Sequence, residues 1–240
     1  MHRYNRCKYL ILYSLILLFS IGAYSQDKPL NLPQYDLRVL HFGFNLGYNQ
    51  FSSMLRVKEP LPNPDEVIGL SVAPQHGFHL GILGDLKIHE YFRLRFNPTL
   101  SFSDRKFQYT VYDYYGRIKK DHTNIEAIYL ETPLELKIQT KRWRNFRPYL
   151  IAGLKHAYDL ASLKTKKIAE QDQLLRLNNN DWMYTTGAGF DFYLVYFKLG
   201  IELKTSFSFK DMHIPEPHKP YSNMIDAYKT QIFYFNITFE

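Results

Sequence analysis

The sequence predicts an all-β fold, an eight-stranded antiparallel up-and-down transmembrane β-barrel of the outer-membrane type. Three observations lead to this prediction. Apolar and polar side chains alternate in eight separate stretches, and the connections between these stretches alternate in length. Aromatic residues also make up 17% of the 240-residue chain, although its mean hydropathy is only −0.34. This combination is typical of such barrels, because each strand faces lipid on one side and a polar interior on the other.

The first stretch, VLHFGFNLGYNQF, covers residues 39–51. Leu40, Phe42 and Phe44 fall on one face, whereas His41, Asn45 and two glycines fall on the other. A period of two indicates a β-strand, because successive side chains of a strand point to opposite faces. Glycines and amides suit a crowded interior better than a solvated surface. We therefore expect the apolar face to contact lipid and the polar face to line a narrow lumen.

Seven further stretches repeat this alternation. They cover residues 77–88, 92–103, 128–139, 148–160, 184–194, 197–209 and 230–240. The pattern is less clear in the fourth of these, where Tyr149 and Ile151 share a face with Lys155. Pro98 and Pro133 lie inside predicted strands, where each removes a ladder hydrogen bond. We expect a β-bulge at each of these two prolines.

The connections between the stretches run long, short, long, short, long, short, long. The long ones cover about residues 51–74, 110–125, 161–180 and 210–228, and the short ones lie near residues 89–91, 140–147 and 194–196. Outer-membrane barrels have long external loops and tight periplasmic turns. A soluble sandwich or a lipocalin-like barrel has no reason to segregate loop lengths so regularly.

Residues 1–25 have the pattern of a secretory signal peptide, with a basic start, an apolar core and small residues before Gln26. The alternative is a single transmembrane anchor, which would need about 20 apolar residues. The expected organisation is a signal peptide (1–25), a periplasmic lead-in (26–38) and the barrel (39–240), in the outer membrane of a Gram-negative bacterium. The only cysteine, Cys7, lies in the signal peptide, so we expect neither a disulfide nor a lipid anchor.

Removing the three basic residues of the signal peptide lowers the formal net charge from +7 to +4. This mild excess fits anionic surroundings such as lipopolysaccharide and does not indicate nucleic-acid binding. One cluster of lysines, at residues 164–167, falls in a predicted outer loop, where contact with lipopolysaccharide is expected.

Charged residues of the predicted strands fall on the inward faces. On the lipid face an Arg or Lys near the membrane midplane would cost about 2–4 kcal/mol, whereas opposite charges inside the barrel can pair. We therefore expect a lumen charge network of Asp85, Arg93, Arg95, Glu131, Glu135, Lys137, Lys155, Asp191, Glu202 and Lys204.

The basic stretch KRWRNFR forms a predicted periplasmic turn. Its residues are either interfacial anchors or contacts to a partner protein: Lys141, Arg142, Trp143, Arg144, Phe146 and Arg147. The interfacial anchor is the simpler interpretation, since Trp and Tyr gather where a barrel leaves the bilayer.

No catalytic, cofactor or metal site is expected. His76 and His79 lie three residues apart, but on a strand that spacing points them to opposite faces. Glu131 and Glu135 could form a catalytic carboxylate pair, yet charge pairing with basic lumen residues explains them more simply. A lipid-modifying barrel enzyme would need a nucleophile or activated water beside a His and a carboxylate, and no compact group of this kind emerges.

Several strands resemble one known family. GFHLGILGDLKIHEYFRLRFNPTLSF, YLETPLELK, NFRPYLIAGLKHAYDLAS and GFDFYLVYFKLGIELKTSFS are similar to segments of the PorT (SprT) proteins, which are outer-membrane barrel components of the type IX secretion system. The resemblance spans about residues 38–240. It implies an accessory role in protein export, and in gliding motility where present, beside a large translocon barrel. An eight-stranded barrel holds little more than its own side chains, so cargo cannot pass through it. A stand-alone barrel that stabilises the envelope or acts as an adhesin is the alternative.

Overall fold

A computed structural model describes residues 29–57, 67–112, 117–161, 178–214 and 225–240. The chain divides into two compact units, Met1–Asn31 and Leu32–Glu240. Only residues 29–31 of the first unit are described, so the predicted signal peptide lies outside the described residues, as do the lysines at 164–167. Within the described residues, no helix is long and apolar enough to cross a membrane.

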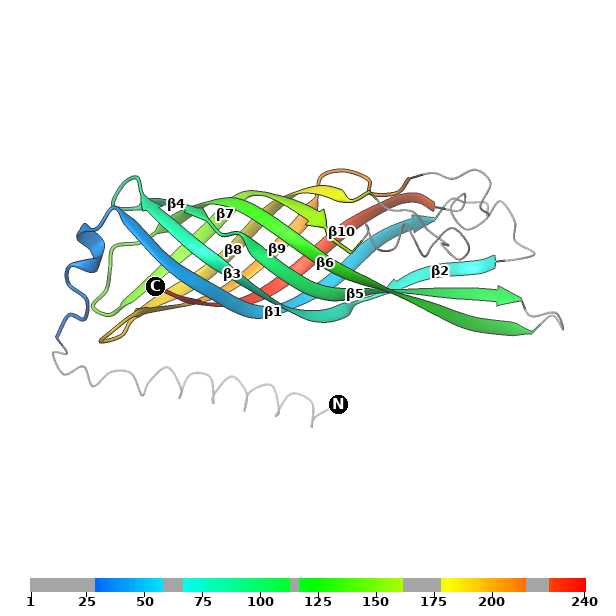
Figure 1. Cartoon of the computed structure of the whole chain (residues 1–240), viewed down its shortest axis with the longest axis horizontal. Helices are drawn as coiled ribbons and strands as arrows, with labels where there is room; N and C mark the ends of the chain where they lie inside the picture. The colour runs from blue at the N-terminus through cyan, green and yellow to red at the C-terminus, as the bar shows by residue number, and fades with distance from the viewer. Residues whose placement is uncertain (1–28, 58–66, 113–116, 162–177, 215–224) are drawn as a thin grey trace, which may run out of the picture. The chain divides into compact units, whose positions relative to one another are not determined.

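The second unit is a closed antiparallel β-barrel (Figure 1). Its strands are β1 (Leu40–Val57), β2 (Val67–Ala73), β3 (Gln75–Lys87), β4 (Phe92–Phe96), β5 (Thr99–Tyr112), β6 (Ile118–Gln139), β7 (Phe146–Asp159), β8 (Asn180–Tyr193), β9 (Lys198–Ser208) and β10 (Ile225–Phe239). Each of β6 to β10 pairs with its neighbour in the chain, and β1 closes the ring by pairing with both β3 and β10. β2 with β3, and β4 with β5, each make up one member of the ring. The predicted eight-stranded up-and-down barrel is confirmed.

Alternation along the strands separates the two faces of the wall. On β1, Phe42 and Phe44 are 70% and 54% exposed on the outside, whereas Asn45 and Asn49 are buried inside. The same division holds for β7, where Tyr149, Ile151 and Lys155 all point inward and Leu150 and Leu154 point outward. A wall whose outer face is apolar and whose inner face is polar is suited to a lipid bilayer.

The predicted bulges at Pro98 and Pro133 are wrong. Pairing keeps one register on both sides of the break between β4 and β5, and β6 runs through Pro133 without a shift. The Asn97 N–H donates to the Pro133 carbonyl, and the Ile82 N–H donates to the Pro98 carbonyl. In an antiparallel pair each proline nitrogen would donate back to the carbonyl of that same residue, Asn97 or Ile82, but proline has no N–H to donate. The strand is therefore interrupted at residues 97–98 because two ladder bonds are missing there.

A register change occurs instead at Pro74, between β2 and β3. Ala73 pairs with Lys106 and Phe78 pairs with Phe102, so residues 74–77 stand opposite residues 103–105. One extra residue on the first strand is the geometry of a β-bulge. Proline suits this position because a bulged residue need not donate to the ladder.

Strands β5 and β6 project beyond the rest of the wall at the end of the long connections (Figure 1). Pairing of β6 with β7 begins at Tyr129, whereas pairing with β5 continues to Ile118. A membrane-spanning strand needs only about 9–11 residues. The projecting ribbon, to which β2 adds a third strand, therefore contains about 35 Å of β6 beyond the pairing of β6 with β7, at about 3.3 Å per residue. The predicted connections at residues 51–74 and 110–125 were thus too long.

A closed ring of hydrogen bonds has a direct electrophoretic consequence. We expect the folded protein, kept unboiled in dodecyl sulfate, to migrate differently from the boiled protein, because the barrel has no free edge from which to unzip. Circular dichroism of the same detergent-solubilised sample should show a β spectrum. A mainly helical spectrum would contradict the fold.

Candidate functional site

The lumen holds the charged residues that the alternation placed there. All ten predicted network residues lie inside the barrel, and each is at most 6% exposed. Ion pairs join six carboxylates to six basic groups: Asp85, Glu131, Glu135, Asp191, Glu202 and Glu240 with Arg93, Arg95, Lys137, Lys155, Lys198 and Lys204. Within this set of ion pairs, each buried carboxylate has a basic partner and each basic group has an acidic one.

Arg95 on β4 is the centre of the larger part of this network. Its guanidinium is fully buried and contacts Glu202, Asp85 at 3.2 Å and Glu240 at 3.4 Å. Arg93 approaches the other oxygen of Asp85 at 2.8 Å. An arginine suits this position because its planar group offers five donors, enough to serve several carboxylates at once.

Lysines continue the network to both sides of Arg95. Lys204 lies between Glu202 and Glu135, with Nζ–Oε distances of 3.6 and 3.1 Å. On the other side, Lys198 and Lys137 both contact Asp191, at 3.7 and 2.6 Å.

Tyr149 also belongs to this cluster. Its hydroxyl donates to Glu202 at 2.8 Å, and the Lys137 ammonium lies 3.7 Å from the centre of its ring. Both contacts stabilise charged groups that would be costly to bury without a partner.

A second, separate group lies nearer the long-connection end. Lys155 contacts Glu131 at 3.1 Å, and the Tyr234 hydroxyl donates to Glu131 at 2.8 Å. Beside this group, His79 and Asn45 line a cavity of about 20 Å³. That volume is near the minimum needed for one water molecule.

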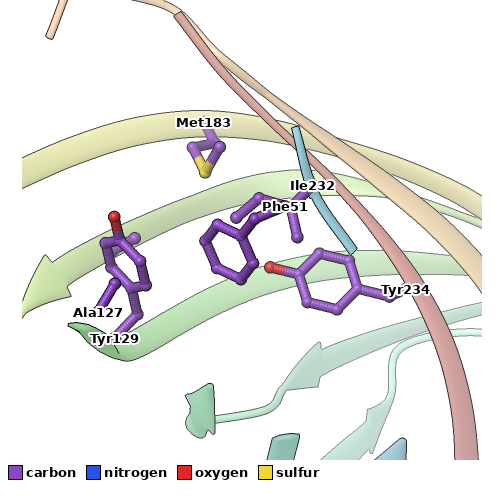
Figure 2. Packing of buried hydrophobic residues seen from close by; sticks show 7 residues of the cluster. Phe51, Ala127, Tyr129, Met183, Ile232 and Tyr234 are labelled. Carbon is purple, nitrogen blue, oxygen red and sulfur yellow. The ribbon is translucent and has the colours of Figure 1, made fainter. Parts of the chain in front are cut away.

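An apolar cluster fills the lumen beyond these charges (Figure 2). The rings of Phe51 and Tyr129 stack with centroids 5.2 Å apart, and Met183 and Ile232 lie beside them. This cluster was not predicted, because strict alternation indicates a polar lumen. Together with the ion pairs, the cluster closes the described part of the barrel interior.

The N-terminal segment (residues 32–38) occupies the short-turn end of the barrel. It contains a short 3-10 helix, η2 (Tyr35–Leu37). The Tyr35 hydroxyl donates to Glu240 at 2.6 Å, its ring stacks on His41, and Lys198 lies 4.7 Å from the centre of the ring. Burial raises the pKa of the Tyr35 hydroxyl, and the negative charge of Glu240 raises it further. This donor therefore stays protonated.

Asp36 fastens the same segment to β7 and to the turn before it. Its carboxylate accepts from Arg147 at 2.9 Å and from Arg142 at 3.5 Å, and its carbonyl accepts from Lys87 at 2.6 Å. Burial alone would raise the pKa of Asp36, but the Arg147 and Arg142 guanidinium groups outweigh it and lower that pKa below its ordinary value. What sequence analysis described as a lead-in is thus docked at the barrel mouth.

The side chains of the basic turn take different positions in the structure. Arg142 and Arg147 face inward to Asp36, and Arg142 also lies 3.6 Å above the Tyr193 ring. Trp143 is 75% exposed. Lys141 and Arg144 are exposed too, whereas Phe146 packs against the rings of Phe190 and Phe192.

Replacing Asp36 with asparagine should loosen the N-terminal segment. The two guanidinium contacts would lose their anion, and we expect trypsin to cleave after Arg38 about three- to tenfold faster, measured by mass spectrometry of the folded barrel. A carboxylate with a lowered pKa contributes stability above its ordinary pKa, and that contribution is lost as the pH falls through the folded value. Lowering the pH should therefore weaken the docking of the wild-type segment but not that of the variant. Asp226→Asn, at the opposite end, should leave cleavage unchanged, and equal rates in both variants would contradict the docking role.

The predicted lumen network did not include Lys198 or Glu240, and the contacts of Arg142 and Arg147 with Asp36 were not predicted. Alternation could have found the first two, because Lys198 shares a face with Glu202 and Glu240 shares one with Asn236. No cluster of three His, Cys, Asp or Glu side chains suited to a metal occurs in the described ranges. His76 is exposed and His79 is buried, on opposite faces of β3.

Comparison with solved structures finds other small barrels. OprG of Pseudomonas aeruginosa is 14% identical, with 84% of this chain and 95% of that chain covered at a TM-score of 0.44. Neisserial surface protein A is 9% identical (84% and 98% covered, TM-score 0.39), and the outer membrane protease OmpT of Escherichia coli is 9% identical (90% and 99% covered, TM-score 0.41). No curated protein matches the chain.

A family model, the outer membrane protein beta-barrel domain, matches residues 24–213. This range runs from before the N-terminal segment to beyond the end of β9, which is most of the chain. The match agrees with the closed ring of strands, the apolar outer wall and the paired charges inside. The chain therefore belongs to the outer membrane protein beta-barrel domain family and is located in the outer membrane.

Proposed function

We propose that this protein is a stand-alone small outer-membrane barrel that stabilises the envelope and conducts no solute. One observation carries the proposal: paired charges and the apolar cluster fill the described part of the lumen with buried side chains. Each network residue with which Arg95 pairs is itself buried. A barrel of this kind acts through its wall, loops and turns and not through a pore.

Two measurements test this function. In planar bilayers the purified barrel should give no channel steps under conditions in which a general porin conducts. A strain that lacks the gene should take up a hydrophobic dye faster than wild type, and the intact gene should restore the barrier. Stable conductance, or an unchanged barrier under envelope stress, would refute the proposal.

We also propose that the barrel has no catalytic activity. The inward His41 takes a structural position: its ring contacts Arg93 and donates to the Tyr35 carbonyl at 2.9 Å. Glu131 is held by Lys155 and Tyr234 and so is not poised as a general base. Mass analysis of lipid A and phospholipids should be identical with and without the gene. A missing modification would establish the lipid-modifying alternative.

A second candidate is an accessory role in type IX secretion. It rests on the resemblance of two segments to PorT proteins. GFDFY lies at the end of β8, and YFKLGIELK covers the last two residues of the following turn and the first part of β9. Deleting the gene would then trap proteins that bear the C-terminal secretion domain in the periplasm and, in a gliding organism, stop motility. The barrel would act beside the large translocon barrel, as a scaffold or assembly factor. Normal secretion in the deletion strain would leave the stand-alone role as the better account.

A further inference from the structure

A cleft of about 550 Å³ opens at the short-turn end of the barrel. Its walls come from the N-terminal segment, from the start of β1 and from Tyr196 in the turn between β8 and β9. Outer-membrane barrels place their short turns in the periplasm. The cleft therefore lies where the barrel wall meets the periplasmic leaflet of the membrane.

One wall of the cleft continues the lipid-facing surface of the barrel. Leu40 and Phe42 are 48% and 70% exposed and lie on the same face of β1 as Phe44 and Leu46. The lipid-facing surface of the barrel therefore continues into the cleft. Tyr196, 90% exposed at its rim, is the type of residue that gathers where bilayer and water meet.

A positive charge also lines the cleft. Arg38 is exposed, and its guanidinium has no ion pair or hydrogen bond to any described residue. Leu37 and Val39 beside it are 76% and 59% exposed, so the arginine is flanked by apolar side chains. A cation between exposed apolar groups matches a lipid phosphate beside its glycerol and acyl chains.

The acidic residue at the cleft, Glu240, does not repel an anion bound there. Glu240 also lines the cleft, but its side chain is fully buried and pairs with Lys198 at 2.8 Å and with Arg95. The Tyr35 hydroxyl also donates a hydrogen bond to the Glu240 carboxylate. The charge of the Glu240 side chain is therefore neutralised within the barrel, whereas the charge of Arg38 is exposed at the cleft.

We propose that this cleft binds one glycerophospholipid of the periplasmic leaflet, with its phosphate on Arg38 and an acyl chain on Leu40 and Phe42. A volume of about 550 Å³ suits a headgroup, the glycerol and the first part of the chains. The bound lipid would join the N-terminal segment to the bilayer. The proposed site does not depend on any role in secretion.

Native mass spectrometry of the barrel in mild detergent tests the site with three probes. Phosphatidylglycerol supplies both phosphate and chains, diacylglycerol supplies the chains alone, and glycerol 3-phosphate supplies the phosphate alone. We expect one retained phosphatidylglycerol and little retention of the other two. Equal retention of diacylglycerol, displacement of the phospholipid by glycerol 3-phosphate, or no retained lipid would each overturn the proposal.

Substitutions then locate the binding. Arg38→Gln should weaken retention of phosphatidylglycerol about tenfold, as expected for the loss of one charged contact. Lys141→Gln removes an exposed charge from the same end and should change nothing. Phe42→Ala should also weaken retention, whereas Phe190→Ala, at an outward position on β8, should not. Heat-dependent migration on a gel checks that each variant is folded, and equal retention by Arg38→Gln and Lys141→Gln would refute the site.

Discussion

Replacing Arg95 with methionine is expected to destabilise the barrel by about 3–5 kcal/mol, because removal of one partner leaves buried charges without compensation. Arg95 contacts three carboxylates, Asp85, Glu202 and Glu240, and none of them can reach solvent. The basic groups nearby already serve other acids, as Lys204 serves Glu135. Methionine fills much of the space, so the loss reports charge and not a cavity.

The free energy of unfolding can be measured by urea titration in lipid vesicles, followed by tryptophan fluorescence. Arg56→Met is the matched control, since its pair with Asp226 is exposed and 3.9 Å long, and should cost less than about 1 kcal/mol. Combining Arg95→Met with Glu202→Gln should recover part of the stability, because one stranded charge is removed with its partner. Equal costs for Arg95→Met and Arg56→Met would show that the lumen charges are not a structural network.

Placing a methyl group at Gly189 is expected to destabilise the barrel by about 1–3 kcal/mol through overpacking. A Cβ there would lie 2.6 Å from the Tyr149 ring and 2.7 Å from the Ile201 carbonyl oxygen. The strand backbone cannot give way without breaking its ladder, so the Tyr149 ring must move. Its hydrogen bond to Glu202 and its contact with Lys137 would then be lost as well.

Gly84→Ala provides the comparison on another strand. Its nearest neighbour would be the Phe96 carbonyl oxygen at 3.7 Å, an ordinary contact, so this variant should match wild type in the same urea titration. Tyr149→Phe in the Gly189→Ala background separates the two causes. If the hydrogen bond to Glu202 is already lost, removing the hydroxyl should cost little more. Equal stability of Gly189→Ala and Gly84→Ala would mean that the Tyr149 ring is not held against the strand.

The strand count could be predicted from sequence because a membrane wall imposes opposite requirements on its two faces. Phe42 and Asn45 cannot exchange faces without exposing an amide to lipid, so alternation is strict where the wall is embedded. Beyond the membrane that requirement ends. Residues 118–128 of β6 form a projecting ribbon and lack a clear apolar face, which is why their strand was not predicted. The effect of the two prolines on the sheet could not be predicted either. Pro98 and Pro133 interrupt hydrogen bonds to the neighbouring strands, but the strand pairing keeps the same register on both sides of each proline.

The residues that face inward could be predicted from the alternation, but the ion pairs that they form inside the barrel could not. Arg95 and Glu202 are 107 positions apart, and their contact depends on how the ring closes. Tyr129 and Met183 also occupy inward positions, where alternation alone expects polar groups. Contacts between the basic turn and Asp36 depend on where the N-terminal segment docks. No local pattern encodes that position.

The contacts of the N-terminal segment also set an order of assembly. Tyr35 and Glu240 are 205 positions apart, and Asp36 and Arg147 are 111 apart. Such distant contacts form only after the intervening chain has been ordered, since loop closure costs entropy before any contact compensates for it. The segment can therefore settle only when β10 has met β1. A chain arrested before that step keeps residues 32–38 accessible, so proteases of the periplasm can distinguish unfinished barrels from completed ones.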